Sequence, residues 1–201
     1  MKILCSSINA LPDRLPAGTR AFTFLEPSSR ADVGRIACDW QRELENAGYA
    51  PSIPVWDFML FCFAVYAADV AVLRKDTADG WTRQIELDIT LNDPGRWDAS
   101  RATVEEMLRV LSGDFWTIRF LPGGSTPPRG NRRLCDRDCV SLLSGGLDSL
   151  IGGIDATAQG RRPIFVSQLA FEDSARQIAY ANALGGEIGR ASCRERVSSP
   201  V

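Results

Sequence analysis

Apolar and polar residues alternate most clearly over residues 81–91, which predicts a strand with one buried face and one wet face. Shorter apolar runs predict further strands at residues 1–5, 21–25 and 115–121. The buried face of the 81–91 strand would consist of Ile85, Leu87, Ile89 and Leu91.

Helical spacing of apolar residues predicts three helices in the same region, at residues 33–47, 55–73 and 104–112. Glycine follows the first and the last of them, at positions 48 and 113, where it commonly ends a helix. A capping box, Thr103-Val104-Glu105-Glu106, marks the start of the last helix. Its core stripe would be Val104, Met107, Leu108 and Leu111.

The 55–73 stretch is apolar enough to suggest a membrane span, but Asp57 and Asp69 interrupt it. A charge near the bilayer centre costs about 2.5–3.5 kcal/mol. We therefore predict a buried amphipathic helix and no membrane span. The N-terminus does not resemble a signal peptide, because only a short apolar stretch follows Lys2. The core residues of the helix would be Phe58, Phe61, Cys62, Val65, Ala68 and Val72.

A run rich in proline and glycine, Pro122-Gly123-Gly124-Ser125-Thr126-Pro127-Pro128, predicts a linker over residues 122–137. This linker separates two predicted domains, residues 1–121 and residues 138–186. The first domain carries no catalytic combination of residues, and its five tryptophans are more typical of a core than of a stacking surface. We expect an N-terminal α+β accessory domain that recognises a substrate or a partner.

Beyond the linker, apolar runs predict strands at residues 140–143 and 163–169, each followed by a helix. The two helices would begin near Asp148 and Asp173. Such alternation of strand and helix indicates the start of a parallel α/β sheet with helical crossovers. One face of the second helix would consist of Ala175, Ile178, Ala179 and Asn182.

The sequence Ser144-Gly145-Gly146-Leu147-Asp148-Ser149 joins the first of these strands to its helix. Glycine allows positive φ and has no Cβ, so the backbone N–H groups can surround an anion. The N-terminus of the following helix favours negative charge at the same point. Ser144 and Ser149 add hydroxyl donors, and Asp148 can hold Mg²⁺. The loop therefore has the chemistry to bind pyrophosphate.

Other phosphate loops and a serine triad are excluded. A Walker loop needs a lysine, and no lysine follows Lys75. The glycines at 145, 146, 152 and 153 lack the spacing of a dinucleotide fingerprint. The chain has no histidine for a triad. A glycine turn that only joins a strand to a helix is the alternative, but such a turn has no use for Asp148 and Ser149.

The loop matches the Ser-Gly-Gly-x-Asp-Ser signature of the PP-loop ATP pyrophosphatases, and the chain resembles that superfamily. Within it, residues 142–186 are most similar to the 7-cyano-7-deazaguanine synthases, in particular to the QueC-like proteins of Qat anti-phage systems. The resemblance implies a ligase that adenylates a deazaguanine carboxylate with ATP, releases pyrophosphate and forms a nitrile with ammonia. Its setting would be queuosine biosynthesis or anti-phage defence, and a defence system would also supply protein partners.

The resemblance also assigns roles to residues. Asp148 would hold Mg²⁺, and Asp148 and Ser149 would act in catalysis. Ser167, Gln168 and Leu169 would lie near the adenosine, but there the sequence departs from the family, since Gln168-Leu169-Ala170-Phe171-Glu172 replaces its Tyr-Gly-Gln type stretch. The zinc cluster of the family lies further along its chains than this sequence extends. The residues implied to bind ATP are Ser144, Gly145, Gly146, Leu147, Asp148 and Ser149.

Two alternatives to this function stay open. The first is another PP-loop enzyme, such as a tRNA thiolase or an amidotransferase synthetase. The second is a recognition fragment without catalysis. A sulfur-carrying cysteine near the active site would favour the thiolase, and a zinc cluster of four cysteines would favour the synthase.

Composition limits the cellular setting. A net charge of −2 argues against general nucleic-acid or membrane-surface binding. Six cysteines are too few for a disulfide scaffold of this length, so we expect reduced thiols in a cytoplasmic protein. Cys135 and Cys139 are at most half a zinc site, and free cysteines are the preferred interpretation.

Residues 187–197 match one translated frame of a short-read sequencing adapter. A natural basic tail is the alternative. We predict that residues 187–201 are non-native and that the parallel α/β domain is truncated after residue 186. Because a parallel sheet builds its pocket from several strands, we expect catalysis of the intact parent and not of this fragment.

Overall fold

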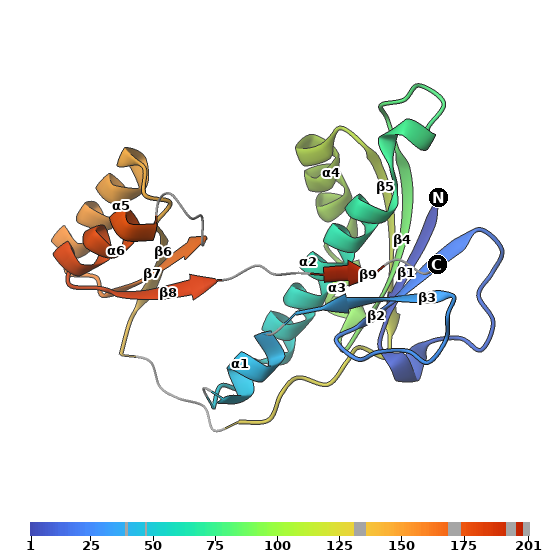
Figure 1. The fold of residues 1–201 in the computed structure, drawn as a ribbon, viewed down its shortest axis with the longest axis horizontal. Helices are drawn as coiled ribbons and strands as arrows, with labels where there is room; N and C mark the ends of the chain where they lie inside the picture. The colour runs from blue at the N-terminus through green and yellow to red at the C-terminus, as the bar shows by residue number, and fades with distance from the viewer. Residues whose placement is uncertain (39, 47, 131–135, 169–173, 192–195, 199–201) are drawn as a thin grey trace. The chain divides into compact units, whose positions relative to one another are not determined.

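A computed structural model describes the chain except residues 39, 47, 131–135, 169–173, 192–195 and 199–201. The chain forms two compact units, residues 1–132 with 195–201, and residues 133–194. Each unit contains parallel strands and helices (Figure 1), so the fold is mixed α/β.

The first unit is built on a sheet with the strand order β5-β4-β1-β2-β3-β9. Strand β1 lies between β2 and β4, and the five strands from β5 to β3 all pair in parallel. Strand β9 pairs with β3 in the antiparallel direction. The strands are β1 (Lys2–Ser6), β2 (Thr19–Phe24), β3 (Val33–Ala37), β4 (Gln84–Leu91), β5 (Phe115–Pro122) and β9 (Arg196–Ser198).

The parallel pairing corrects the α+β prediction for residues 1–121. The order of strands reverses at β1, with β2 and β3 on one side and β4 and β5 on the other. Successive parallel strands need crossover connections, and helices lie in the connection from β3 to β4, which crosses over β2 and β1, and in the connection from β4 to its neighbour β5. Alternation along a sequence predicts a half-buried strand but not its direction. The region is therefore an α/β unit with the strand order of a doubly wound sheet.

Helices cover one face of this sheet (Figure 1). Helix α1 (Trp40–Asn46) precedes α2 (Ile53–Ala71), which packs on β2 and β4. Helices α3 (Pro94–Asp98) and α4 (Arg101–Ser112) pack on β5. On the other face Leu11 and Leu15, from the connection after β1, pack on a small apolar cluster of Leu4, Ala21 and Val33.

Helix α2 is long and apolar enough to cross a membrane by length and composition. One side of it is nevertheless buried in the core of the unit, with Trp56, Leu60 and Ala64 fully inaccessible to solvent. This agrees with the predicted buried helix. The predicted stripe was partly wrong, because Phe58 is 57% exposed and Cys62 is also exposed. Apolar residues lie on both the buried and the exposed side of the helix, so their spacing does not select the buried face.

Residues 33–47 do not form the single helix that was predicted. Val33–Ala37 is strand β3, with Val33 and Ile36 buried, and α1 begins at Trp40. Branched Val and Ile side chains fit a pleated sheet, and pairing with β2 outweighs the helical spacing. Gly48 follows α1 with a left-handed φ of 72°, as expected at a helix end.

Helix α4 begins at Arg101, earlier than the predicted capping box. Thr103 therefore lies inside the helix and does not cap it. Glu105 instead accepts a hydrogen bond from the backbone N–H of Ile118, at 2.7 Å. This bond ties the helix to strand β5, which is a tertiary role that the local pattern does not reveal.

Two predicted faces were partly wrong. In α4 Leu108 is buried, but Met107 and Leu111 are 44% and 74% exposed, because this helix covers only the edge of the sheet. In β4 the predicted apolar face is buried, but Asp88 and Thr90 on the other face are buried as well. Asp88 pairs with Lys2 and Arg119, and Thr90 accepts a hydrogen bond from the N–H of Ser7.

A buried ion-pair network lies where β4 and β5 begin. Asp114 is completely buried and Arg83 is 4% exposed. The guanidinium of Arg83 donates to Asp114 Oδ2 from Nη2 at 2.6 Å and from Nε at 3.0 Å. Arg74 donates to Asp114 Oδ1 at 3.0 Å, and Asp69 accepts from Arg83 at 2.5 Å. Burial raises the pKa of Asp114, but the hydrogen bonds from Arg83 lower it more, so the net pKa lies below its ordinary value.

The second unit is a parallel sheet in the order β6-β7-β8. Helix α5 (Leu147–Ala158) joins β6 (Cys139–Leu142) to β7 (Pro163–Gln168). Helix α6 (Ser174–Ala183) joins β7 to β8 (Glu187–Ala191). The predicted alternation of strands and helices is therefore present. Strands β8 and β9 fall in residues 187–201, whose foreign origin stays a prediction.

Candidate functional site

The predicted loop lies between β6 and α5, at the carboxyl end of a parallel strand. Leu143 is fully buried, and its N–H donates to the carbonyl of Val166 in β7 at 2.8 Å. Gly145 has a φ of 91°, which glycine adopts without strain. Gly146 precedes the first residue of α5, Leu147. The strand, the glycine turn and the helix start thus follow one another as predicted.

Ser144 and Ser149 close the loop on itself. The backbone N–H and the hydroxyl of Ser144 donate to Ser149 Oγ, at 3.2 and 3.1 Å. The hydroxyl of Ser149 donates to the carbonyl of Gly146 at 2.9 Å, and the N–H of Gly146 donates to Ser144 Oγ at 3.4 Å. Both hydroxyls therefore shape the loop before any ligand is present. An anion that takes these donors replaces bonds within the loop.

The exposed side of the loop offers a carboxylate and a helix N-terminus. Asp148 lies in the first turn of α5, is exposed, and makes no hydrogen bond or ion pair within the described part of the chain. As in any helix, the first N–H groups of α5 have no acceptor inside the helix. The loop therefore presents uncommitted donors next to an uncommitted carboxylate.

The fit of Mg²⁺ to this site follows from the donor set. Among the described residues no group of three or more Cys, Asp or Glu side chains is placed to hold a metal ion. Mg²⁺ usually binds through one or two carboxylates together with phosphate oxygens and water. Asp148 thus suits an ion that arrives with a nucleotide, and not a metal held by protein ligands alone.

Gln177 supports the loop, although the sequence pattern did not single it out. The predicted face of α6 was wrong, because Gln177 and Ala181 are the buried residues of that helix. The side-chain amide of Gln177 donates to the carbonyl of Ser144 at 3.1 Å. A buried glutamine needs hydrogen-bond partners, and this partner lies 33 residues away in the sequence. Helical periodicity contains no signal for such a contact.

Ser167 lies near the carboxyl end of β7, where the resemblance places the adenosine. It follows Val166, whose carbonyl accepts from Leu143 directly before the loop. Ser167 is 3% exposed, and its Oγ has no hydrogen-bond partner among the residues that the structure describes. A buried hydroxyl without a partner costs about 1–3 kcal/mol, so it marks a point where a ligand gains by supplying the bond. The departing residues 169–172 lie outside the described part of the chain.

We expect Ser167→Ala to raise the stability of the second unit by about 1 kcal/mol, because it removes an unsatisfied buried hydroxyl. The same change should weaken nucleotide binding if Oγ bonds to the ligand. Hydrogen exchange of the Leu143 amide measures the stability, and titration with MgATP measures the affinity. Slower exchange together with unchanged affinity would show that Ser167 Oγ does not bond to the nucleotide. Faster exchange would show that Oγ has a partner in the folded chain.

The described cysteines form no disulfide with one another. Cys5 is buried, Cys38 and Cys139 are partly exposed, and Cys62 is exposed. Burial raises the pKa of the Cys5 thiol, which keeps it protonated and unreactive. Cys135 and Cys193 lie outside the described residues. The interpretation of Cys135 and Cys139 as separate cysteines, and not as half a zinc site, therefore stays a prediction.

Comparison with known proteins adds no relative to this picture. No protein-family model matches the chain, and no match was found among the curated proteins or among the solved structures. The functional interpretation therefore depends on the loop and on the residues around it.

Proposed function

We propose that residues 138–186 begin the nucleotide-binding domain of an ATP-dependent enzyme of the PP-loop type. Such an enzyme adenylates its substrate and releases pyrophosphate. The observation that carries the proposal is the loop of residues 144–149, which follows a parallel strand and leads into the N-terminus of α5. Its glycine turn, two hydroxyls and free carboxylate are the groups that a magnesium pyrophosphate needs.

In this proposal the loop stabilises the leaving group of the reaction. A substrate carboxylate attacks the α-phosphorus of ATP, and the bond to the β,γ-pyrophosphate breaks. Negative charge then grows on the pyrophosphate, which the N–H groups at the start of α5 and the hydroxyls of Ser144 and Ser149 bind. Mg²⁺, held by Asp148 and phosphate oxygens, would neutralise part of that charge. Gln177 would keep the loop in position through the carbonyl of Ser144.

The nature of the substrate is the finer part of the proposal. The similarity of residues 142–186 to the 7-cyano-7-deazaguanine synthases favours a deazaguanine carboxylate, with ammonia as the nitrogen source. We propose a cytoplasmic carbon–nitrogen ligase that serves queuosine biosynthesis or anti-phage defence, in the second case with protein partners. Incubating the parent protein with the deazaguanine carboxylate, MgATP and ammonium should yield the nitrile, AMP and pyrophosphate. A tRNA thiolase would instead release no nitrile.

The exposed residues of β6 support a larger nucleotide domain. Val140 and Leu142 are 68% and 74% exposed, and they share one face of the strand. Parallel sheets normally have both faces covered, so bare apolar side chains on a parallel strand are unusual. Further elements of the parent protein would cover this face and complete the pocket above the carboxyl ends of the strands.

The loop assignment is tested by titrating the chain with magnesium pyrophosphate and following its backbone amides by NMR. We expect the signals of Gly145 and Gly146 to shift. Asp148→Asn and Ser149→Ala should weaken binding about 10-fold or more, since a bond to a charged group contributes about 1.5–3 kcal/mol. Unchanged affinity in both variants would contradict the assignment.

Helix α5 itself offers matched controls. Asp155→Asn removes an exposed carboxylate of the same helix, two turns beyond Asp148. Thr157→Ala removes a hydroxyl at the other end of the helix, which bonds only to the carbonyls of Gly153 and Ile154 among the described residues. Both controls should bind pyrophosphate as the original chain does. An equal loss in the controls would indicate damage to the helix and not to the loop.

A further inference from the structure

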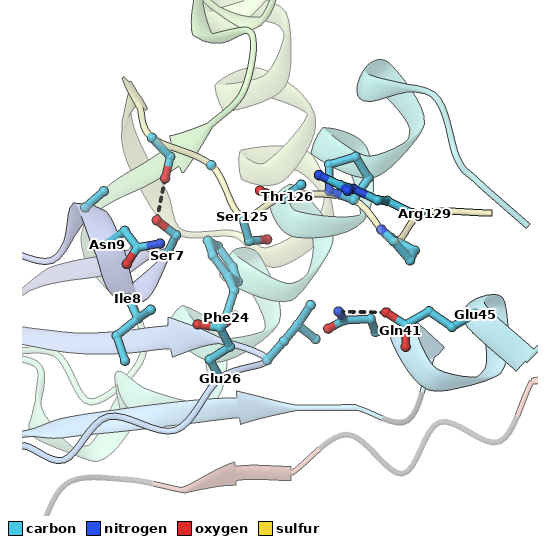
Figure 2. A pocket seen from close by; sticks show the side chains of 16 residues that line it. Ser7, Ile8, Asn9, Phe24, Glu26, Gln41, Glu45, Ser125, Thr126 and Arg129 are labelled. Carbon is cyan, nitrogen blue, oxygen red and sulfur yellow. Dashed lines mark hydrogen bonds between the residues drawn. The ribbon is translucent and has the colours of Figure 1, made fainter.

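A pocket lies at the carboxyl edge of the sheet in the first unit (Figure 2). Its volume is about 520 Å³. Its walls are the turn after β1 (residues 7–10), the turn after β2 (residues 24–26) and the segment 123–129 that follows β5, together with Gln41 and Glu45 of α1. Parallel α/β sheets bind their ligands at the carboxyl ends of the strands. The pocket is therefore where this fold places a ligand.

The segment 123–129 is a fixed wall of this pocket. The hydroxyl of Ser7 donates to the carbonyl of Gly123 at 2.6 Å, and the indole N–H of Trp56 donates to the carbonyl of Ser125 at 2.8 Å. The N–H of Gly124 donates to the carbonyl of Leu91 at 3.1 Å. These bonds hold the segment across the ends of β1 and β4. Apart from the two residues of α1, the other residues that line the open space lie at or after the ends of β1 and β2, so the pocket lies beside the ends of these two strands.

A strained turn forms another wall. Leu25 has a φ of 64° and is the non-glycine residue with positive φ in the described chain. The N–H of Glu26 donates to the carbonyl of Phe24 at 2.6 Å, so the three residues form a γ-turn. Arg35 donates to the carbonyl of Leu25 at 2.7 Å and helps to hold the turn. Such strain costs about 1–3 kcal/mol, and it clusters at ligand sites. Here it places Glu26 at the pocket.

Charges of both signs line the pocket without neutralising one another. Arg129 makes no hydrogen bond or ion pair within the described part of the chain, and neither Glu26 nor Glu45 pairs with it. The amide of Gln41 donates to Glu45 Oε1 at 3.2 Å and orients that carboxylate, as Figure 2 shows. Ser125 Oγ is buried and has no hydrogen-bond partner in the described part of the chain. Within the described residues the pocket thus contains a cation and two carboxylates that form no ion pair, and a buried hydroxyl without a hydrogen-bond partner.

We propose that this pocket binds a small zwitterion, an α-amino acid or a dipeptide. The ammonium group would lie toward Glu26 and Glu45, and the carboxylate toward Arg129, each in charge-assisted hydrogen bonds. The apolar part would contact Ile8 and Phe24. A ligand with only a negative charge would be repelled by the two carboxylates. A ligand with only a positive charge would leave Arg129 without a counter-charge. A ligand with both charges satisfies all three groups.

The test is calorimetric titration of the full chain with four probes that share the branched side chain of leucine. L-Leucine and the dipeptide Leu-Leu carry both charges, 3-methylbutylamine lacks the carboxylate, and 4-methylpentanoate lacks the ammonium. We expect leucine or the dipeptide to bind at least 10-fold more tightly than either single-charge analogue. The stronger of the two distinguishes a free amino acid from a peptide ligand. Equal binding of an analogue, or no binding of leucine and Leu-Leu at millimolar concentration, overturns the proposal.

Variants connect the binding to the pocket. Glu26→Gln and Arg129→Gln should each weaken the zwitterion about 10-fold, and Arg129→Gln should bring its affinity down to that of the amine. Exposed residues outside the pocket serve as controls, Glu43→Gln on α1 and Arg14→Gln after β1. Unchanged affinity in Glu26→Gln and Arg129→Gln contradicts the assignment. Asp148→Asn should leave zwitterion binding unaltered, which separates this site from the proposed pyrophosphate loop.

Discussion

Replacing Asp114 with alanine should lower the unfolding free energy of the first unit by about 3–5 kcal/mol. The substitution leaves the guanidinium of Arg83 buried without its main partner. Arg83 donates three hydrogen bonds to this carboxylate, from its backbone N–H, Nε and Nη2. Asp69 is 54% exposed and compensates only in part. Removing one member of a buried pair costs far more than the pair contributes as a whole.

Tryptophan fluorescence during urea unfolding measures this loss. All tryptophans of the chain, at positions 40, 56, 81, 97 and 116, belong to the first unit, so the signal is specific to it. Asp76→Ala is the control, because Asp76 is exposed and its side chain makes no hydrogen bond or ion pair within the described residues. A change below about 1 kcal/mol in Asp114→Ala would contradict the buried network, since ordinary surface substitutions reach only about 0.5 kcal/mol.

The contribution of Asp114 should also depend on pH. Its pKa in the folded chain lies below the ordinary value of 3.8, because the hydrogen bonds from Arg83 outweigh its burial. A lowered carboxyl pKa stabilises the fold above the unfolded pKa and ceases to do so as pH falls through the folded pKa. The stability difference between the original chain and Asp114→Asn should therefore be constant near neutral pH and shrink below about pH 4. A difference that grows in acid would contradict this sign.

Gly124→Ala should destabilise the first unit by about 2–3 kcal/mol and weaken the pocket. A Cβ on Gly124 would lie 2.6 Å from the backbone N of Asn92 and 2.6 Å from the carbonyl carbon of Leu91. Both atoms belong to the chain leaving β4, which cannot move aside as a flexible side chain can. The segment 123–129 must then lift from the sheet, and Trp56 loses its bond to the carbonyl of Ser125.

The measurement combines urea unfolding with calorimetry of leucine binding. Gly95→Ala is the matched control, because its nearest obstacle is a side-chain oxygen of Asp93 at 3.9 Å, an ordinary contact. The control should stay within about 1 kcal/mol of the original chain. Full stability of Gly124→Ala would mean that the segment does not lie against β4. Lower stability together with unchanged leucine binding would show that the position of this segment does not affect the pocket.

The backbone course of residues 144–149 is the part of the candidate site that the sequence determined by itself. It depends on glycines and on a helix start, which are local properties, and Gly145 does take a positive φ. Most strands and helices were predictable for the same reason, because the period of two or 3.6 residues between apolar positions can be recognised within a short segment. The Gly48 and Gly113 helix ends belong to this class too.

Tertiary structure decided what depends on distant residues. Residues 33–37 form a strand because they pair in parallel with β2. The parallel pairing of the whole sheet also makes residues 1–121 an α/β unit, where an α+β domain was expected. The bond from Gln177 to Ser144 selected the buried face of α6. The pocket joins residues as far apart in the sequence as Ser7 and Arg129, and no local pattern predicts that they lie together. A sequence pattern encodes local dihedral angles and amphipathic faces. The direction of a strand, the buried side of a mostly apolar helix and the contact between separate turns are decided only when the whole unit packs.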